Sequence, residues 1–448
     1  MPVTKLECLT AEIASLRPVY NVGRVVQVGS GTLTVIGLSD TASLGDQVKI
    51  LRRGNDPMGG EVLQLSRHKI VILPDRSAEG VVIGDRVTLL GQAQIAPDES
   101  WIGRVIDPSG NPLDGRPLLR GIKSRPMRAA PPKATERHAL GERLETGVAV
   151  FNTMLPIVRG QRIGMFAGSG VGKSTLLAKF ARGVSADVVV IALVGERGRE
   201  VREFVDTVLG PEGMKRAVVV AATSDQSPLV RRRCAWTAMA VAEHFRDQGL
   251  HVLLLADSIT RFAEAHREVA LASGEVASLR GYPPSTSHMI MSLCERAGPG
   301  AGDTGDITAL FSVLVAGSDM DEPVADILRG VLDGHVVLDR KIAERGRFPA
   351  IDLLRSVSRS LPNAATPTEN DLINKSRRLL GAYDQAELMI QAGLYTSGSD
   401  ALIDEAIAVW PHLDAFLARD EPDNTKASFE HLAACFPNEP EEQSTGLE

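Results

Sequence analysis

The stretch Ile163-Gly-Met-Phe-Ala-Gly-Ser-Gly-Val-Gly-Lys-Ser-Thr-Leu-Leu177 decides the fold at the centre of this chain. An apolar strand leads into a glycine-rich loop, and a helix follows the loop. Loops of this kind turn successive backbone N–H groups inward around a polyphosphate, and the helix N-terminus adds partial positive charge. The sequence therefore predicts a nucleoside triphosphate site formed by Gly168, Ser169, Gly170, Val171, Gly172, Lys173, Ser174 and Thr175.

Lys173 and Ser174 carry the predicted chemistry of this loop. Lys173 would contact the terminal phosphates, and the Ser174 hydroxyl would ligate Mg2+. The motif ordinarily begins with Gly, whereas this chain has Ala167 there, but the three glycines that surround the phosphates are present. A tight turn followed by a chance Lys-Ser pair is the alternative, and the flanking strand and helix favour the phosphate loop.

Composition and charge narrow the class of protein. The chain has 448 residues, a net charge of −7 and a pI near 5.8, so it has no whole-chain electrostatic reason to bind nucleic acid. Aromatic residues make up only 4% of the chain, so stacking platforms for single-stranded nucleic acid are scarce. The four cysteines form no CxxC pair, no apolar run approaches the roughly 20 residues of a membrane span, and the N-terminus lacks signal-peptide features. These features predict a cytoplasmic protein with reduced cysteines and no nucleic-acid partner.

Changes in hydrophobic periodicity divide the chain into segments. Short β-rich runs with two similar turns, Gly45-Asp-Gln-Val48 and Gly84-Asp-Arg-Val87, are typical of a small barrel. Apolar strands then alternate with helical patterns, which indicates a parallel sheet covered by helices, with strands at 162–167, 188–194, 218–222, 251–256 and 307–314. We predict an amphipathic helix at 1–18, a β-barrel at 19–92, an α/β domain at 93–367 with a linker at 107–134, a helical domain at 368–437 and a disordered tail at 438–448.

The N-terminal helix has an apolar face made by Leu6, Leu9, Ile13 and Leu16. The helix either packs on its own domain or docks on a partner helix or a membrane surface. The sequence favours neither interpretation.

Two carboxylates follow apolar strands of the predicted sheet. Ligands gather at the carboxyl ends of strands in open α/β sheets, so Glu196 and Asp257 are candidate site residues. Asp257 suits an outer Mg2+ ligand, with a simple helix cap as the alternative. Glu196 would orient the water that attacks the terminal phosphate, with a surface salt bridge to Arg197 or Arg199 as the alternative.

Several further motifs carry a family resemblance. In chain order they are Gly195-Glu-Arg-Gly-Arg-Glu200, Asp257-Ser-Ile-Thr-Arg261, Arg280-Gly-Tyr-Pro-Pro284, Leu332-Asp-Gly-His335 and Phe348-Pro-Ala-Ile-Asp352 with Ser356-Val-Ser-Arg359. Together they closely resemble the hexameric rotary ATPases, and within them the ATPases of type III protein export. The resemblance covers about residues 20 to 420. It implies a RecA-like P-loop ATPase domain flanked by an N-terminal β-barrel and a C-terminal helical domain, with ATP and Mg2+ as cofactors.

The resemblance also implies roles for single residues. Glu196 matches the catalytic glutamate, Arg197 a contact of the γ-phosphate, and Phe348 the aromatic residue that packs on adenine. Arg359 matches the arginine finger that enters the next subunit's site, where it would stabilise charge on the transferred phosphoryl group. Because Glu196 and Arg359 lie in one chain, copies of this chain alone would complete every site, which predicts a homohexamer.

The resemblance implies partners as well. These are a stalk-like export regulator on the N-terminal helix, a coiled-coil stalk protein in the ring, export-gate membrane proteins, and export chaperones with their substrates. The expected location is the cytoplasmic side of the inner membrane, peripheral to the export apparatus.

The segment Ile342-Ala-Glu-Arg-Gly-Arg-Phe-Pro-Ala-Ile351 favours the flagellar branch of the export ATPases. A virulence-type export ATPase, an ATP synthase catalytic subunit, an RNA translocase and a non-catalytic scaffold are the alternatives. Two segments depart from the family pattern, Arg231-Arg-Arg-Cys-Ala-Trp236 and Ser285-Thr-Ser-His-Met-Ile-Met291. The arginine run is expected to form a solvated or interface surface rather than a nucleic-acid site.

Overall fold

The computed structural model describes residues 5–16, 19–29, 31–315, 320–421 and 423–436. It divides into two compact units. Unit 1 comprises residues 1–141, 159–169 and 186–333, and unit 2 comprises residues 142–158, 170–185 and 334–448. The tail predicted as disordered, residues 438–448, lies outside the described residues.

The N-terminal part of unit 1 is a closed antiparallel barrel with the strand order β1-β2-β5-β4-β3-β6. Its strands are β1 Val22–Val28, β2 Leu33–Ile36, β3 Gln47–Leu51, β4 Met58–Leu65, β5 Ile70–Pro74 and β6 Arg86–Gly91. Alternate side chains, such as Val48 and Ile50 on β3, fill the interior, as the two-residue period of a strand requires.

The two Gly-Asp turns of the barrel share one backbone geometry. Gly45 and Gly84 have φ of +84° and +95°, a region that favours glycine. The buried carboxylates of Asp46 and Asp85 then accept the backbone N–H of the residue three positions earlier, at 2.8 and 3.0 Å. Each turn therefore satisfies its own backbone before the next strand begins.

The parallel sheet of unit 1 has the order β10-β14-β13-β11-β12-β8. Its strands are β8 Arg104–Ile106, β10 Arg162–Ala167, β11 Val188–Glu196, β12 Ala217–Thr223, β13 Val252–Asp257 and β14 Ile307–Leu314, so the five predicted strands are confirmed. They are buried almost throughout, as expected for a parallel sheet covered on its faces. The longer helices of unit 1 are α1 Lys5–Ser15, α6 Pro228–Arg246, α7 Ile259–Ala272, α8 Ser285–Cys294 and α9 Pro323–Val331.

The remaining elements of unit 1 are short. They are β7 Gln94–Ile95, paired with β9 Arg125–Pro126, the turns η1 Glu99–Trp101, η2 Ala134–Glu136 and η4 Leu279–Gly281, and the run α4 Gly198–Glu203, η3 Phe204–Leu209 and α5 Gly210–Met214.

The unusual arginine run of α6 joins the barrel to the sheet within unit 1. The Glu61 carboxylate of β4 accepts from Arg232 Nη2 at 2.8 Å and from Arg128 Nη2 at 2.9 Å. Both guanidinium groups lie over the ring of Trp236, at 4.1 Å for Arg128 and 4.8 Å for Arg232. Arg233 donates to Gln47 of β3 at 2.5 Å. The sequence predicts either a solvated surface or an interface for this run. Arg232 and Arg233 are both buried, and they form an interface between the barrel and the sheet within unit 1.

The same network reaches the second unusual segment. Arg232 Nη1 lies 3.2 Å from His266 Nδ1, and His266 Nε2 lies 2.8 Å from Ser285 Oγ. A guanidinium can only donate, so Nδ1 accepts and the ring proton sits on Nε2, from which it is donated to Ser285. The Ser285 hydroxyl then donates to Glu275 at 2.7 Å. We call Glu61, Arg128, Arg232, His266, Ser285 and Glu275 the junction network.

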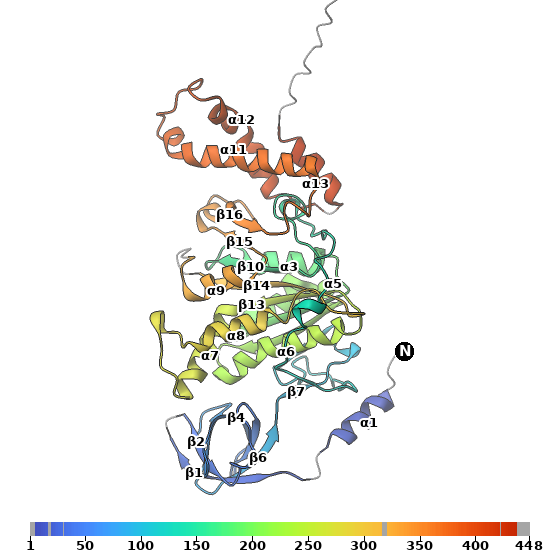
Figure 1. Ribbon diagram of the computed structural model, residues 1–448, viewed down its shortest axis with the longest axis vertical. Helices are drawn as coiled ribbons and strands as arrows, with labels where there is room; N and C mark the ends of the chain where they lie inside the picture. The colour runs from blue at the N-terminus through green and yellow to red at the C-terminus, as the bar shows by residue number, and fades with distance from the viewer. Residues whose placement is uncertain (1–4, 17–18, 30, 316–319, 422, 437–448) are drawn as a thin grey trace, which may run out of the picture. The chain divides into compact units, whose positions relative to one another are not determined.

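Unit 2 contains a two-stranded antiparallel ribbon and the C-terminal helices (Figure 1). Its elements are α2 Ala149–Asn152, α3 Lys173–Gly183, β15 Gly334–Leu338, α10 Arg340–Glu344, β16 Ile351–Ser358, α11 Pro367–Gln391, α12 Ala401–Leu417 and α13 Thr425–Ala433. A capping box of Thr366 and Glu369 begins α11. The buried Asn152 amide accepts from Thr146 Oγ1 at 2.8 Å and donates to Ser428 Oγ at 3.0 Å, which ties α2 to α13.

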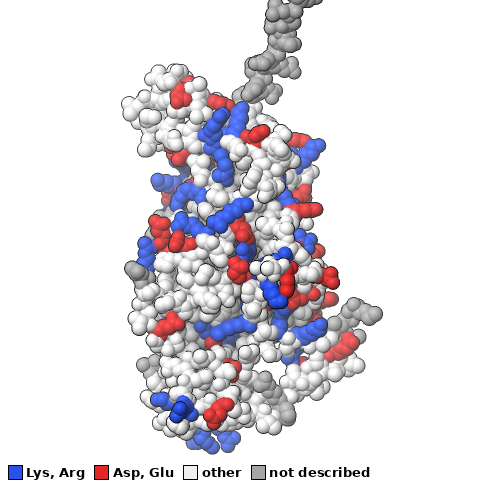
Figure 2. Space-filling view, viewed as in Figure 1, with Lys and Arg blue, Asp and Glu red and all other residues white. Residues whose placement is uncertain are grey.

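The described residues contain no helix that is long and apolar enough to cross a membrane. On the face drawn in Figure 2, Lys and Arg side chains are interspersed with Asp and Glu side chains.

Candidate nucleotide-binding site

Glu196 and Asp257 lie at the carboxyl ends of neighbouring strands in unit 1. In the parallel pairing of β11 with β13, Leu193 is level with Asp257, and Glu196 ends β11 three residues further on. At the same edge β10 ends at Ala167, which is level with Leu314 of β14. The sheet thus brings two predicted site carboxylates to the edge at which the phosphate loop begins.

Asp257 is a buried, oriented carboxylate. Its side chain is 4% exposed, and Ser312 Oγ on β14 donates to Oδ1 at 2.6 Å. The cap of α7 is Ser258, whose Oγ accepts from the N–H of Arg261 at 3.3 Å. Ser258 therefore provides the side-chain cap of α7, and Asp257 stays a candidate site residue.

Glu196 stands just after an irregularity in its strand. Gly195 has φ of +70°, and the β11–β12 register shifts between Val194 and Glu196. Such a bulge re-aims the side chain that follows it. The Glu196 carbonyl accepts from Ser224 N at 2.9 Å, which fixes the backbone at this point.

Arg197 pairs with Glu200, whereas the sequence suggests Glu196 as its alternative partner. Its guanidinium is largely exposed and donates to Glu200 Oε1 at 2.7 Å. Burial raises the pKa of Glu200, but hydrogen bonds with Arg197 and Glu196 outweigh it, so this pKa lies below its ordinary value. The Arg197–Glu200 pair closes the first turn of α4.

The phosphate loop leads directly into α3. Gly170 and Gly172 have φ of +78° and +85°, which a residue with a side chain would adopt only under strain. Gly172 is the N-cap of α3 and offers no side chain to its first N–H groups. Ser174 and Thr175, in the first turn, are exposed. The helix N-terminus thus has the character of an anion site.

Phe348 lies beside the loop in unit 2. A Cβ atom placed on Gly172 would lie 3.1 Å from Phe348 Cδ1, so the ring edge rests against the last glycine of the loop. The ring is 49% exposed. This combination of contact and exposure suits a surface on which a planar base packs.

Arg359 is presented outward by the two serines that flank it. Ser358 and Ser360 are buried, and their hydroxyls lie 2.6 and 3.3 Å from the Pro156 carbonyl oxygen. Arg359 follows the last residue of β16, at the start of a turn, and is exposed between the two buried serines. A serine on either side of the arginine was a signal in the sequence that our interpretation did not use.

Two supporting residues were also missed. Ser312 is a fully buried hydroxyl in the otherwise almost wholly apolar strand β14, and that contrast could have identified it. Lys179 of α3 donates to Asp420 Oδ1 at 2.5 Å, tying the helix after the phosphate loop to the segment after α12. No local pattern indicates that second contact.

Comparison with known proteins identifies the family of the chain. Residues 147–358 match the ATP synthase alpha/beta family, nucleotide-binding domain, and residues 365–434 match the T3SS EscN ATPase C-terminal domain. The flagellum-specific ATP synthase of Caulobacter vibrioides is 44% identical over 427 residues, covering 94% of this chain and 96% of that protein.

Solved structures show the same relationship. The assembled ATPase EscN of the enteropathogenic E. coli type III secretion system matches with a TM-score of 0.85 and 35% identity, covering 92% of this chain and 99% of that one. EscN in complex with its central stalk EscO matches with a TM-score of 0.83 and 36% identity, with the same coverage. The predicted fold class and family resemblance are confirmed. The chain belongs to the type III protein-export branch of the ATP synthase alpha/beta family, and it is a nucleotide-binding ATPase.

Proposed function

We propose that this ATPase works as a homohexameric ring in flagellar protein export, where ATP hydrolysis releases chaperones and unfolds export substrates. The observation that carries the proposal is that strand-end Glu196 and outward Arg359 occur in the same chain. A ring of identical copies would then have a water-orienting carboxylate and an arginine finger at every interface.

Each site residue has a distinct proposed task. Lys173 contacts the terminal phosphates from the start of α3, and Arg197 leaves Glu200 to contact the γ-phosphate. Glu196 accepts a hydrogen bond from the attacking water and orients it in line with the bond that breaks. Arg359 of a neighbouring copy stabilises the charge on the transferred group.

The chemistry of the two proposed ligands suits a magnesium ion. Mg2+ prefers oxygen ligands and in nucleotide sites uses one or two protein groups together with substrate phosphates and water. The exposed Ser174 hydroxyl offers one oxygen, and the Asp257 carboxylate, oriented by Ser312, offers an outer one. When bound, the ion would neutralise charge on the phosphates.

The N-terminal helix supports a regulator-binding role. Cys8 is 3% exposed and its Sγ lies 4.0 Å from Asp98 Oδ2, so one side of α1 faces its own unit. The predicted apolar face, in contrast, is 50 to 72% exposed at Leu6, Leu9, Ile13 and Leu16. The buried side of α1 thus supports packing on its own unit, and the exposed apolar side supports docking on a partner. The exposed side suits an apolar helix of an export regulator.

The remaining partners are proposed from relatives. EscN has been solved with its central stalk EscO, which supports a coiled-coil stalk in the ring of the present protein. Export-gate membrane proteins, chaperones and substrates complete the proposed assembly, at the cytoplasmic side of the inner membrane.

Mixing two inactive variants tests the shared site. Glu196→Gln and Arg359→Ala should each lack turnover in a pure ring. A mixture of equal parts should regain activity at about a quarter of the interfaces, because one copy supplies the glutamate and its neighbour the arginine. A mixture as inactive as its components would show that the two residues do not act across one interface.

Complementation tests the biological role. A deletion strain carrying Lys173→Ala should lack filaments and motility, while the wild-type gene restores both. Normal motility together with lost effector secretion would assign the chain to virulence export instead.

A further inference from the structure

Phe348 lies on a short connection between α10 and β16, at residues 345–350. Two arginines, Arg345 and Arg347, come immediately before it, separated by Gly346. Gly346 has φ of +82°, so the chain turns between the two arginines. The position of the Phe348 ring therefore depends on what holds these two side chains.

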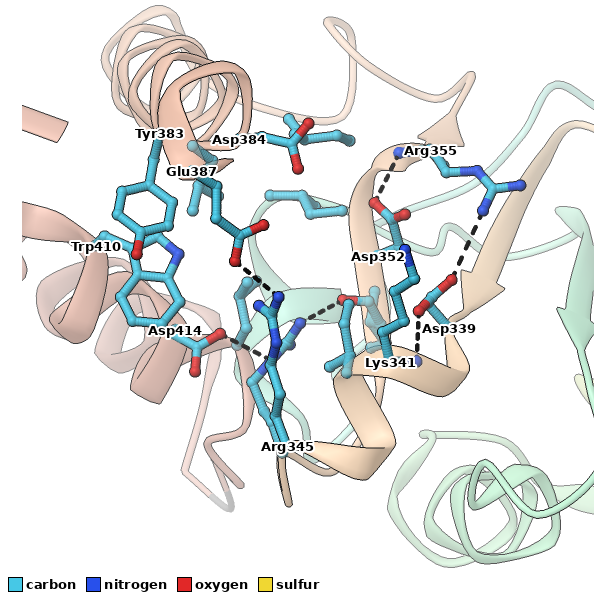
Figure 3. A pocket seen from close by; sticks show the side chains of 17 residues that line it. Asp339, Lys341, Arg345, Asp352, Arg355, Tyr383, Asp384, Glu387, Trp410 and Asp414 are labelled. Atoms are coloured by element: carbon cyan, nitrogen blue, oxygen red, sulfur yellow. Dashed lines mark hydrogen bonds and ion pairs between the residues drawn. The ribbon is translucent and has the colours of Figure 1, made fainter. Parts of the chain in front are cut away.

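Both arginines form ion pairs with the C-terminal helices of the same unit. Arg345 Nη2 lies 2.7 Å from Glu387 Oε1 on α11, and Arg347 Nε lies 2.9 Å from Asp414 Oδ1 on α12. Arg347 Nη2 also donates to the Ile351 carbonyl at 2.8 Å. Figure 3 shows the Glu387 and Asp414 carboxylates, from two different helices, converging on the segment that carries Arg345. We call these two ion pairs the C-terminal clamp.

The clamp borders a cavity of about 390 Å3 rather than a packed core. The Arg347 side chain is 9% exposed, and neither its Nη1 nor its Nε has a hydrogen-bond acceptor among the described residues, so the contact of Nε with Asp414 is an ion pair only. Burial lowers the pKa of this guanidinium, while Asp414 and Asp352 act in the opposite direction. Close-packed contacts would hold the arginines rigidly, whereas this space lets them follow a moving partner.

The two helices that carry the carboxylates are joined to each other. Tyr383 of α11 and Trp410 of α12 stack with ring centroids 4.6 Å apart and planes inclined by 15°. The pair lines the same cavity as the clamp (Figure 3). A displacement of α11 would therefore carry α12 with it, and both ion pairs would pull on the connection together.

We propose that Arg345 and Arg347 are positioning residues for base recognition, which couple the placement of α11 and α12 to the placement of the Phe348 ring. The inference rests on the proposed contact of Phe348 with adenine. Movement of the C-terminal helices then changes ATP affinity through the base, while the phosphate contacts of Lys173 and Ser174 stay as they are.

The test is the full-length Asp414→Asn variant, which keeps the shape of the side chain and removes its charge. KM for ATP should rise roughly three- to tenfold, the size of the coupling between contacting residues, while kcat changes less than about twofold. Inhibition by inorganic tripolyphosphate, which has no base, should be unchanged. Asp414→Glu, which keeps the charge, should restore the wild-type KM.

The matched control is Glu344→Gln. It breaks the exposed pair between Arg340 and Glu344 within α10, 3.0 Å long, and does not involve the C-terminal helices. KM should stay at the wild-type value, and thermal unfolding of both variants should show that they are folded. If Asp414→Asn weakens tripolyphosphate and ATP equally, or leaves KM unchanged, the clamp does not position the base contact.

Phe348→Ala distinguishes the proposed adenine contact of Phe348 from the proposed action of the clamp on its ring. If this variant raises KM and Asp414→Asn adds nothing in its background, the clamp acts through the ring. If Phe348→Ala raises KM but Asp414→Asn adds its full effect, the clamp acts elsewhere and the inference is wrong. If Phe348→Ala leaves KM unchanged, the proposed adenine contact fails and the inference fails with it.

Discussion

Arg232, which contacts the barrel, and Arg345, which contacts the C-terminal helices, each pair with a glutamate but in different surroundings. Arg232 and Glu61 are each 5% exposed in a pair 2.8 Å long, whereas Arg345 and Glu387 are 51% and 22% exposed in a pair 2.7 Å long. Two charges removed from water leave a large penalty if either partner is lost, while a solvated pair leaves little. The Arg232–Glu61 pair of the junction network therefore suits a fixed connection, and the Arg345–Glu387 pair of the C-terminal clamp suits an adjustable one.

The connectivity of the hydrogen bonds points in the same direction. In the junction network each hydrogen bond leads to the next, from Arg232 through His266 and Ser285 to Glu275. Linked hydrogen bonds resist displacement of any single member.

The largest expected effect is that of Glu61→Gln. The change leaves Arg232 charged and buried without its carboxylate, which should lower the free energy of unfolding of unit 1 by about 3 to 5 kcal/mol. Urea unfolding followed by tryptophan fluorescence measures this, because both guanidinium groups contact the Trp236 ring. A loss of less than about 1 kcal/mol, the range of exposed pairs, would remove the distinction between the two regions.

The pH dependence of stability should come next in size. Burial lowers the pKa of His266 from its ordinary 6.5 to about 4, and the charge of Arg232 is the second cause. The charge of Arg128 also lowers this pKa, whereas Glu275 and Glu61 raise it. The folded state therefore binds fewer protons than the unfolded state between these values, so stability is lost as the pH falls from about 6.5 to 4. His266→Gln should flatten unfolding curves measured across this window, and an unchanged slope would show that His266 is not their source.

The smallest effect is expected at the clamp. A double-mutant cycle of Arg345→Met and Glu387→Gln should give a coupling free energy for unfolding of about 0.2 to 1 kcal/mol, and 1 M salt should remove most of it. The corresponding cycle of Arg232→Met and Glu61→Gln should give a larger coupling that salt hardly changes. Equal couplings would mean that exposure does not separate a fixed joint from an adjustable one in this protein.

Local sequence was sufficient for the strands and for the loop between β10 and α3. Apolar runs identified the strands, and the position of Asp257 after such a run indicated the edge of the sheet at which it lies. These signals depend on neighbours in the chain, which a single sequence displays directly.

Contacts between distant parts of the chain were not predictable in this way. Glu61 lies 171 positions before its partner Arg232, and Ser358 lies 202 positions after the Pro156 carbonyl that it contacts. The consecutive arginines 231–233 are identical as letters, and only the barrel against them determines that two of them are buried. The exposure of Arg359 likewise depends on its buried neighbours rather than on a pattern of its own.

Gly172 has a consequence for the interpretation of binding measurements. The residue is ordinarily explained by the phosphates that its backbone approaches, but here a Cβ atom would also press on the Phe348 ring. Triphosphate affinity and selectivity between nucleobases are commonly treated as independent properties of a nucleotide enzyme. In the binding mode that we propose for this chain, one glycine takes part in both, so a Gly172→Ala variant should alter the two together. Base-modified and base-free competitors are therefore needed side by side to assign any loss of binding at this loop.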